Sequence, residues 1–146
     1  MTTELDAIDR QILSELTRDG RMSVTAVAEA AHISRANAYA RITRLTQEGV
    51  IQRFSAIIDP EKSGLRASAY VTLNVRQDSW RELRQQLTMI PEVQHIALVG
   101  GEFDVLLLVR ATDNADLRRI VFSVLQPIAG VISTRTLLIF DDVDAR

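Results

Sequence analysis

A connection of only four residues, 31–34, separates two short amphipathic segments, and this feature constrains the fold more than any other. Ser23 is placed to cap a helix before the connection, and Ser34 to cap another after it. The apolar positions of these two predicted helices are Val24, Val27, Ala28 and Ala31 in the first, and Ala38, Ile42 and Leu45 in the second. Two short helices joined so tightly are typical of the helix-turn-helix unit, because the helices of a bundle are usually longer.

A third helix and a strand complete the predicted N-terminal domain. The helix precedes the other two, and its apolar residues recur at helical spacing: Leu5, Ile8, Ile12, Leu13 and Leu16. Gly20 stands where a left-handed residue would end this helix. The β-prone run 50–58 stops at Asp59-Pro60, and we interpret it as the strand of a wing. These patterns predict a winged helix-turn-helix domain over residues 1–59.

The outer face of the helix that starts at Ser34 is the candidate surface for DNA. With the apolar positions turned inward, this face has no acidic residue before Glu48. Arginine and asparagine side chains can read guanine and adenine edges, and the amides of a helix N-terminus can meet a phosphate. The candidate DNA-binding residues are Ser34, Arg35, Asn37, Tyr39, Arg41, Thr43 and Arg44, together with Arg53 of the wing. Taken alone, such a face could equally be a solvated, arginine-rich surface.

The rest of the chain alternates strands and helices in the order β-α-β-β-α-β. A Pro-, Gly- and charge-rich linker over residues 60–66 precedes this region, residues 67–146. Ser79 and Glu82 have the spacing of a capping box, and Asp113 is placed to cap a second helix. The predicted strands are 68–75, 93–99, 103–111 and 131–140, with residues 100–102 as a hairpin turn between the middle two. This order predicts a ferredoxin-like antiparallel sheet covered by two helices on one face, so the whole chain is of the α+β class.

One face of that sheet needs other cover. Two short helices cannot hide every apolar residue of the strands, among them Ile96, Leu98, Leu106, Leu108, Leu137 and Ile139. We therefore expect the sheet to pair with that of a second subunit.

The segment 100–104, Gly-Gly-Glu-Phe-Asp, is the candidate site for a small molecule. Paired glycines allow positive φ, and their bare amides can receive a carboxylate, while Glu102 or Asp104 could meet an ammonium group. A zwitterionic amino acid needs both features. The same residues could also form a plain tight turn.

Composition and motifs narrow the class of protein. The chain has no cysteine, and its net charge of −2 argues against a protein that coats nucleic acid nonspecifically, although it leaves room for a local basic face. No apolar run reaches the length of a membrane span, and the N-terminus lacks signal-peptide features, so we expect a cytoplasmic protein. His32 and His95 stand alone, and neither phosphate-loop glycines nor a nucleophile elbow is present. We therefore expect neither an enzyme nor a metal or cofactor site.

The two halves together resemble the Lrp/AsnC regulators, also called feast/famine regulatory proteins. The first half carries the pattern as Leu5-Asp6-x-x-Asp9-x-x-Ile12-Leu13-x-x-Leu16, Asp19-Gly20-Arg21-x-Ser23 and Arg41-Ile42-x-x-Leu45-x-x-x-Gly49-Val50-Ile51. The second half carries it as Val99-Gly100-x-x-Asp104 and Gly130-Val131 to Thr134-x-Thr136. The resemblance implies a homodimer formed through the C-terminal sheets, commonly assembled to an octamer, and double-stranded DNA bound by the recognition helices.

The same resemblance implies an amino-acid effector bound near residues 100–104. The effector-binding residues carried over by position are Val99, Gly100, Gly101, Glu102 and Asp104, with Thr134 and Thr136 from the last strand.

The sequence departs from the family pattern at three positions. His32 stands where a glycine is usual, although histidine tolerates left-handed φ better than most residues. Ala38 stands where valine is usual and fills less of the core, and Thr46 replaces an acidic residue. None of these departures breaks the DNA-binding interpretation.

Two other functions are compatible with the sequence. One is an architectural DNA-binding protein without an effector, and the other is a metabolite-binding module whose helices contact a protein partner.

Overall fold

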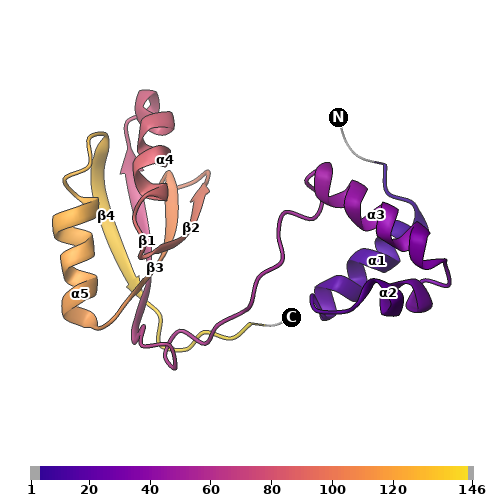
Figure 1. Ribbon diagram of the computed structural model, residues 1–146. Helices are drawn as coiled ribbons and strands as arrows, with labels where there is room; N and C mark the ends of the chain where they lie inside the picture. The colour runs from indigo at the N-terminus through magenta and orange to yellow at the C-terminus, as the bar shows by residue number, and fades with distance from the viewer. Residues whose placement is uncertain (1–3, 145–146) are drawn as a thin grey trace. The chain divides into compact units, whose positions relative to one another are not determined.

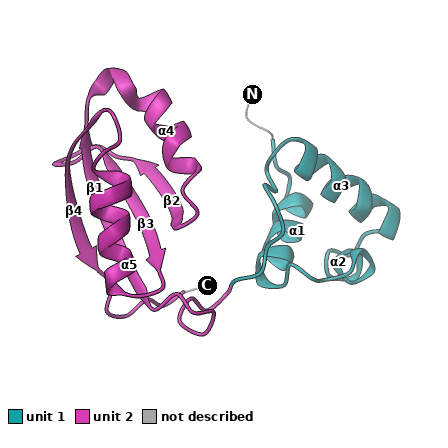
Figure 2. Ribbon diagram, turned by 60° about the vertical axis from the view of Figure 1, so that its left-hand side comes forward, with its two compact units in different colours: residues 1–57, 146 teal, residues 58–145 magenta. Residues whose placement is uncertain are grey.

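The computed structural model describes residues 4–144, which divide into two compact units after Ile57 (Figure 2). The first unit is helical, and the second is a sheet with helices on it. The assignment of residues 1–59 to DNA binding, 60–66 to a linker, and 67–146 to effector binding and oligomerisation stays a prediction.

The first unit has three helices: α1 (Ala7–Arg18), α2 (Val24–Ala30) and α3 (Arg35–Gln47). Both predicted serine caps are confirmed: Ser23 Oγ accepts a hydrogen bond from the Ala26 N–H, and Ser34 Oγ from the Asn37 N–H, each at 3.1 Å. His32, in the turn between α2 and α3, has a φ of 54°. The expectation that this histidine would take the left-handed conformation is therefore confirmed.

Side chains from all three helices meet in one core. Ile12, Val27 and Leu45 are completely buried there, and Ile42 packs against them from α3. Gly20 does not end α1 in the left-handed conformation, contrary to the expectation, because Asp19 already caps the helix in an extended conformation. The three-helix unit therefore follows the predicted pattern in its two serine caps and its core, but not in the end of α1.

The predicted wing strand does not form. Residues 50–66 contain no strand, and the apolar side chains of Phe54, Ile57 and Ile58 are exposed. A strand needs a hydrogen-bonding partner, and residues 4–57 hold no other extended segment that pairs as a ladder. β-propensity alone was therefore a poor guide to this segment.

The second unit follows the predicted order around a four-stranded antiparallel sheet (Figure 1). Its strands are β1 (Ala67–Val75), β2 (Val93–Leu98), β3 (Val105–Ala111) and β4 (Val131–Leu138), arranged in space as β2-β3-β1-β4. Helix α4 (Trp80–Thr88) follows β1, and α5 (Asn114–Arg119) follows β3 and continues as a π-helical segment, Ile120–Leu125. This is the predicted ferredoxin-like topology.

Both helices cover the same face of the sheet, and the core of the unit lies between these two layers (Figure 1). Val71 and Leu73 of β1 and Leu107 of β3 point into this core from the sheet, and Leu83 of α4 and Ile120 meet them from the helical layer. All five are completely buried.

Two local predictions in this unit are wrong. Ser79 makes no capping hydrogen bond to α4, because a 3-10 turn (Gln77–Ser79) precedes the helix and the serine hydroxyl contacts Asp78 instead, at 3.2 Å. The hairpin connection spans residues 99–104 rather than 100–102, and it is closed by a hydrogen bond from the Val99 N–H to the Asp104 carbonyl, at 2.9 Å.

A register shift in β2 decides which apolar side chains the helices cover. Between Val93 and His95 the pairing with β3 slips by one residue, so Ile96 lies opposite the buried Leu107. Ile96 therefore packs against the helix-covered core, whereas Leu98, opposite Val105 on the same side of the sheet, stays 56% exposed. The open face carries Tyr70, Leu106, Leu108 and Leu137, which neighbour one another across β1, β3 and β4.

Within residues 4–144, no helix is both long and apolar enough to cross a membrane.

Candidate functional site

Helix α3 exposes a face that is free of acid along its length. The side chains of Arg35, Asn37 and Tyr39 are exposed, with Tyr39 at 63%, and the small residues Ala36 and Ala40 beside them are exposed as well. The hydroxyl of Ser34 is already used by the helix cap, and Arg53 is exposed on the segment after the helix. Thr43 is half-buried. This face carries hydrogen-bond donors and an aromatic ring, and its small residues let the helix backbone lie close to the floor of a DNA groove. A helix that reads base edges needs these features.

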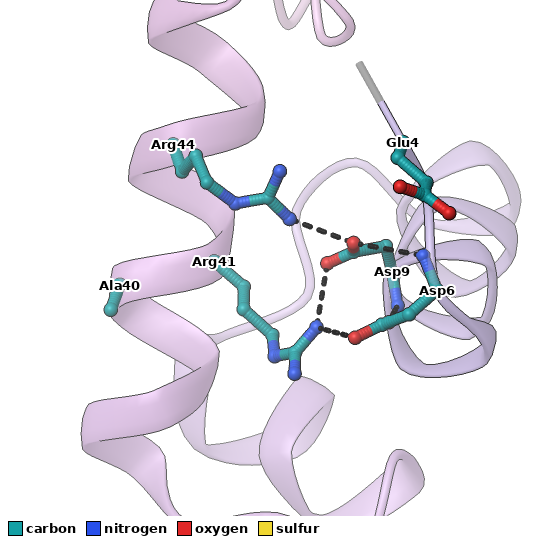
Figure 3. Close-up of a pocket in the computed structure, with 6 residues that line it drawn as sticks. All are labelled: Glu4, Asp6, Asp9, Ala40, Arg41 and Arg44. Atoms are coloured by element: carbon teal, nitrogen blue, oxygen red, sulfur yellow. Dashed lines mark hydrogen bonds and ion pairs between the residues drawn. The ribbon is translucent and has the colours of Figure 1, made fainter.

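The two other predicted arginines of α3 do not point freely outward (Figure 3). Arg41 Nη1 donates to Asp9 Oδ1 at 2.8 Å and to Asp6 Oδ2 at 2.7 Å, and Arg44 Nη2 donates to Asp9 Oδ2 at 2.7 Å. The side chain of Asp9 is 2% exposed, whereas that of Arg41 is 21% exposed. We call this set, Asp6, Asp9, Arg41 and Arg44, the acidic clasp.

The clasp shifts the pKa of every member in the direction that favours the ion pairs. Burial raises the pKa of Asp9, but hydrogen bonds from Arg44 and Arg41 outweigh it, and the result lies below the ordinary 3.8. The Asp9 N–H, and next the Arg41 side chain, lower the pKa of Asp6. The pKa of Arg41 and that of Arg44 are raised by their hydrogen bonds to these carboxylates. All four groups are charged at neutral pH.

Asp6 and Asp9 also form a capping box at the start of α1. Asp6 Oδ1 accepts from the Asp9 N–H at 2.8 Å, and the Asp6 N–H donates to Asp9 Oδ2 at 3.2 Å. An N-cap residue followed three residues later by an acidic residue is the sequence signal that could have predicted this capping box. The sequence reasoning used these aspartates only as family markers and so missed both the cap and the clasp.

In the second unit, the candidate effector loop is a turn with an internal hydrogen-bond network. Gly101 has the predicted positive φ, 137°, whereas Gly100 does not. The carboxylate of Asp104 accepts from the Val75 N–H at 2.8 Å, and its own N–H donates to the Leu73 carbonyl at 3.0 Å. Asp104 thus joins the loop to the end of β1.

A pocket of about 220 Å³ opens beside this loop on the open face of the sheet. Its lining is mostly polar: Thr72, Asn74, Glu102, Phe103, Ser133, Thr134 and Arg135. Glu102 and Arg135 form no ion pair with any residue between 4 and 144, so the pocket holds one unpaired charge of each sign.

The predicted effector residues only partly converge on this pocket. Glu102 and Thr134 line it, but Thr134 pairs with the buried Leu73, so its side chain lies on the helix-covered face, where its hydroxyl accepts a hydrogen bond from Gln126 Nε2 at 3.0 Å. Val99, Gly100, Gly101 and Asp104 belong to the adjoining loop. Thr136 pairs with the buried Val71 and therefore lies on the opposite, helix-covered face. Asn74, Ser133 and Arg135 were not predicted, because strand register decides which face they share.

Across the described part of the chain, no group of three or more His, Cys, Asp or Glu side chains is arranged to hold a metal ion.

A helix-turn-helix unit joined to an antiparallel sheet with a polar pocket defines a class of DNA-binding transcription regulator with a ligand-binding domain. Residues 5–46 match the AsnC-type helix-turn-helix domain, and residues 68–146 match the Lrp/AsnC ligand binding domain. The chain therefore belongs to the Lrp/AsnC family of transcription regulators, which are not enzymes.

Individual relatives cover nearly the whole chain. The leucine-responsive regulatory protein of Klebsiella pneumoniae is 30% identical over 143 residues, which cover 96% of this chain and 87% of that protein. The crystal structure of the leucine response regulatory protein LrpA of Mycobacterium tuberculosis has a TM-score of 0.87 at 31% identity, covering 97% of this chain and 96% of that one. A Neisseria meningitidis regulator solved as an L-Met complex has the same fold, with a TM-score of 0.87 at 24% identity, covering 97% and 93%.

Proposed function

We propose that this regulator reads a double-stranded DNA operator with the exposed face of α3, and that an amino acid bound by residues 67–146 changes its assembly or its DNA affinity. Residues 1–59 would form the DNA-binding domain, with residues 60–66 as a linker. The observation that carries the proposal is the acid-free surface of α3, where Arg35, Asn37 and Tyr39 are exposed together. We place the protein in the cytoplasm, where a bacterial or archaeal chromosome lies.

The direct contacts fall to the exposed side chains of α3. Asn37 offers the amide that pairs with adenine, and Arg35 the fork that pairs with guanine or a phosphate. Arg53 supports a further phosphate contact from outside the helix. In a homodimer, two such helices would enter successive major grooves about 34 Å apart.

The effector would lie in the polar pocket beside the loop 99–104. Glu102 is the candidate partner of the ligand's ammonium group, and Arg135 of its carboxylate. The hydroxyl and amide groups of Thr72, Asn74 and Ser133 favour a small polar side chain on the ligand over a large apolar one. The solved L-Met complex of the Neisseria regulator supports an amino acid as the class of ligand.

The open face of the sheet supports assembly of subunits. Tyr70 and Leu137 are 39% and 48% exposed on it, and Leu106 and Leu108 are half-buried on the neighbouring β3. An apolar face of this kind is the surface through which two sheets pair. We propose a homodimer formed through this face, with dimers assembling to an octamer.

Salt-titrated binding to the DNA upstream of the protein's own gene tests the DNA-reading part. Affinity should fall steeply with added salt, because phosphate neutralisation releases counterions. Arg35→Ala should weaken binding, and Arg84→Ala on α4, an exposed arginine of the other unit, serves as control. A protein whose helices contact another protein would show no salt-dependent DNA binding, and this outcome would overturn the proposal.

Light scattering and DNA affinity, measured with each of the twenty amino acids, test the effector part. One or more polar amino acids should change the particle size or the DNA affinity. Arg135→Gln should weaken that response about tenfold or more, since a hydrogen bond to a charged group contributes about 1.5–3 kcal/mol. Arg84→Gln should leave the response unchanged. An effector-independent architectural protein would bind DNA and respond to none of the twenty.

A further inference from the structure

We propose that Asp6 and Asp9 are specificity-determining residues, because the acidic clasp keeps Arg41 and Arg44 of the recognition helix away from DNA phosphates. The inference rests on the proposed function, since it concerns how α3 meets DNA. It means that two aspartates at the start of α1, and not only the exposed side chains of α3, affect how the protein recognises DNA.

Both guanidinium groups form ion pairs with aspartates of the same unit (Figure 3). Both carboxylate oxygens of Asp9 are occupied, one by Arg41 and one by Arg44, at 2.8 and 2.7 Å. Arg41 Nε donates in addition to Asn37 Oδ1 at 3.1 Å, and Arg44 Nη1 donates to Glu48 Oε2, also at 3.1 Å. Each arginine is therefore held from two sides.

The burial of Asp9 makes these contacts hard to exchange for a phosphate. If both arginines turned toward DNA, the Asp9 carboxylate, which is 2% exposed with them in place, would lose both of its counter-charges. An uncompensated buried charge is strongly unfavourable, so the arginines stay on Asp9 when DNA approaches. Arg35 is different, because it is exposed and has no ion-pair partner among residues 4–144.

Keeping Arg41 and Arg44 away from the phosphates lowers the part of the DNA affinity that does not depend on sequence. Phosphate contacts strengthen binding to every DNA sequence alike, whereas contacts with base edges distinguish one sequence from another. The clasp therefore raises the ratio of operator affinity to non-specific affinity. It also fixes α3 to α1 in the orientation in which Asn37 and Tyr39 are presented.

Neutralising the clasp in the full-length protein tests this inference. Asp9→Asn removes the central charge, and Asp6→Asn removes the second one while keeping a side chain that caps a helix equally well. Asp19→Asn is the charge-matched control, because Asp19 lies in the same unit but forms no ion pair with α3. Dissociation constants for operator DNA and for an unrelated duplex are measured over a salt series, and circular dichroism confirms folding.

We expect that neutralising Asp9 or Asp6 frees Arg41 and Arg44 to contact DNA phosphates. For Asp9→Asn the slope of log K against log salt should steepen by about 1–2, since each new phosphate contact adds about 0.9. Affinity for the unrelated duplex should rise more than affinity for the operator, while Asp19→Asn follows the unmodified protein. Asp6→Asn should change the slope in the same direction by less, and it carries the test if Asp9→Asn does not fold.

Two different negative results have different meanings. If the unmodified protein binds DNA with a steep salt dependence and neither clasp variant changes the slope beyond the control, the role of the clasp is overturned and the DNA-reading function stands. If the unmodified protein shows no salt-dependent DNA binding, the proposed function is overturned, and the clasp inference with it.

Discussion

Gly130 lies against Ser79, so closely that a β-carbon on residue 130 would stand 2.8 Å from Ser79 Cβ and 3.1 Å from its hydroxyl oxygen. The same glycine has a φ of 95°, and its carbonyl accepts a hydrogen bond from the Arg76 N–H at 2.9 Å. The start of β4 is therefore joined to the turn that leads into α4, and only glycine fits at the contact.

Gly130→Ala should destabilise the second unit by about 2–3 kcal/mol, because it adds a steric clash to an unfavourable φ. Gly64→Ala is the matched control: Gly64 has a φ of 96° in the same unit, but its surroundings are open. The control should lose only about 1 kcal/mol. Urea unfolding measures both, and equal losses would show that the Ser79 contact contributes nothing.

His32→Val should destabilise the helix-turn-helix by about 1–2 kcal/mol. His32 has a positive φ, and a β-branched side chain is strongly disfavoured there. His32→Gly should stay within about 1 kcal/mol of the unmodified protein, because relief of strain is offset by a more flexible unfolded chain. Thermal unfolding reports both variants, with Thr25→Val of α2 as the control for adding valine at an exposed helical site.

The N-terminal unit should lose stability in acid through the clasp. The folded-state pKa of Asp9 and that of Asp6 lie below the ordinary 3.8, so both carboxylates stabilise the fold fully above that value. That contribution is lost as the pH falls through the lowered folded-state pKa values. The difference in urea midpoint between the unmodified protein and Asp9→Asn should be constant from pH 7 to 5 and shrink below pH 4. A difference that stays constant down to pH 3 would contradict the assigned pKa shifts.

Arg41→Ala and Arg35→Ala should distinguish an arginine that stabilises the first unit from one that contacts DNA. Loss of Arg35 should reduce the salt slope of DNA binding by about 1, as expected for one phosphate contact. Loss of Arg41 should lower the thermal stability of the first unit and leave the slope close to that of the unmodified protein. A slope reduced by Arg41→Ala as much as by Arg35→Ala would assign Arg41 to the DNA instead.

Local signals were enough to predict much of this fold. Periodicity and capping chemistry act over a few residues, and they correctly predicted the caps at Ser23 and Ser34, the buried faces of the three helices, and the order of strands and helices in the second unit. The prediction was wrong where a distant partner decides the structure. Residues 50–58 have β-prone side chains but no strand to pair with, and Ser79 lost its capping role to the preceding turn.

The candidate sites were harder to predict for the same reason. The register shift after Val93 and the pairing of Thr136 with Val71 decide which side chains share a face, and neither can be read from alternation alone. Helical periodicity placed Arg41 on the flank of the outer face and Arg44 on that face itself, whereas both side chains turn toward Asp9. It could not show that an aspartate 32 residues earlier in the sequence would bind Arg41.

The acidic clasp also has an evolutionary consequence. Because Arg41 and Arg44 hold α3 in place, the exposed Arg35 and Tyr39 carry little of the unit's stability and can be exchanged without unfolding it. Descendants of such a protein can therefore acquire new target promoters through a few substitutions on one helical surface, while the framework that presents that surface is inherited intact.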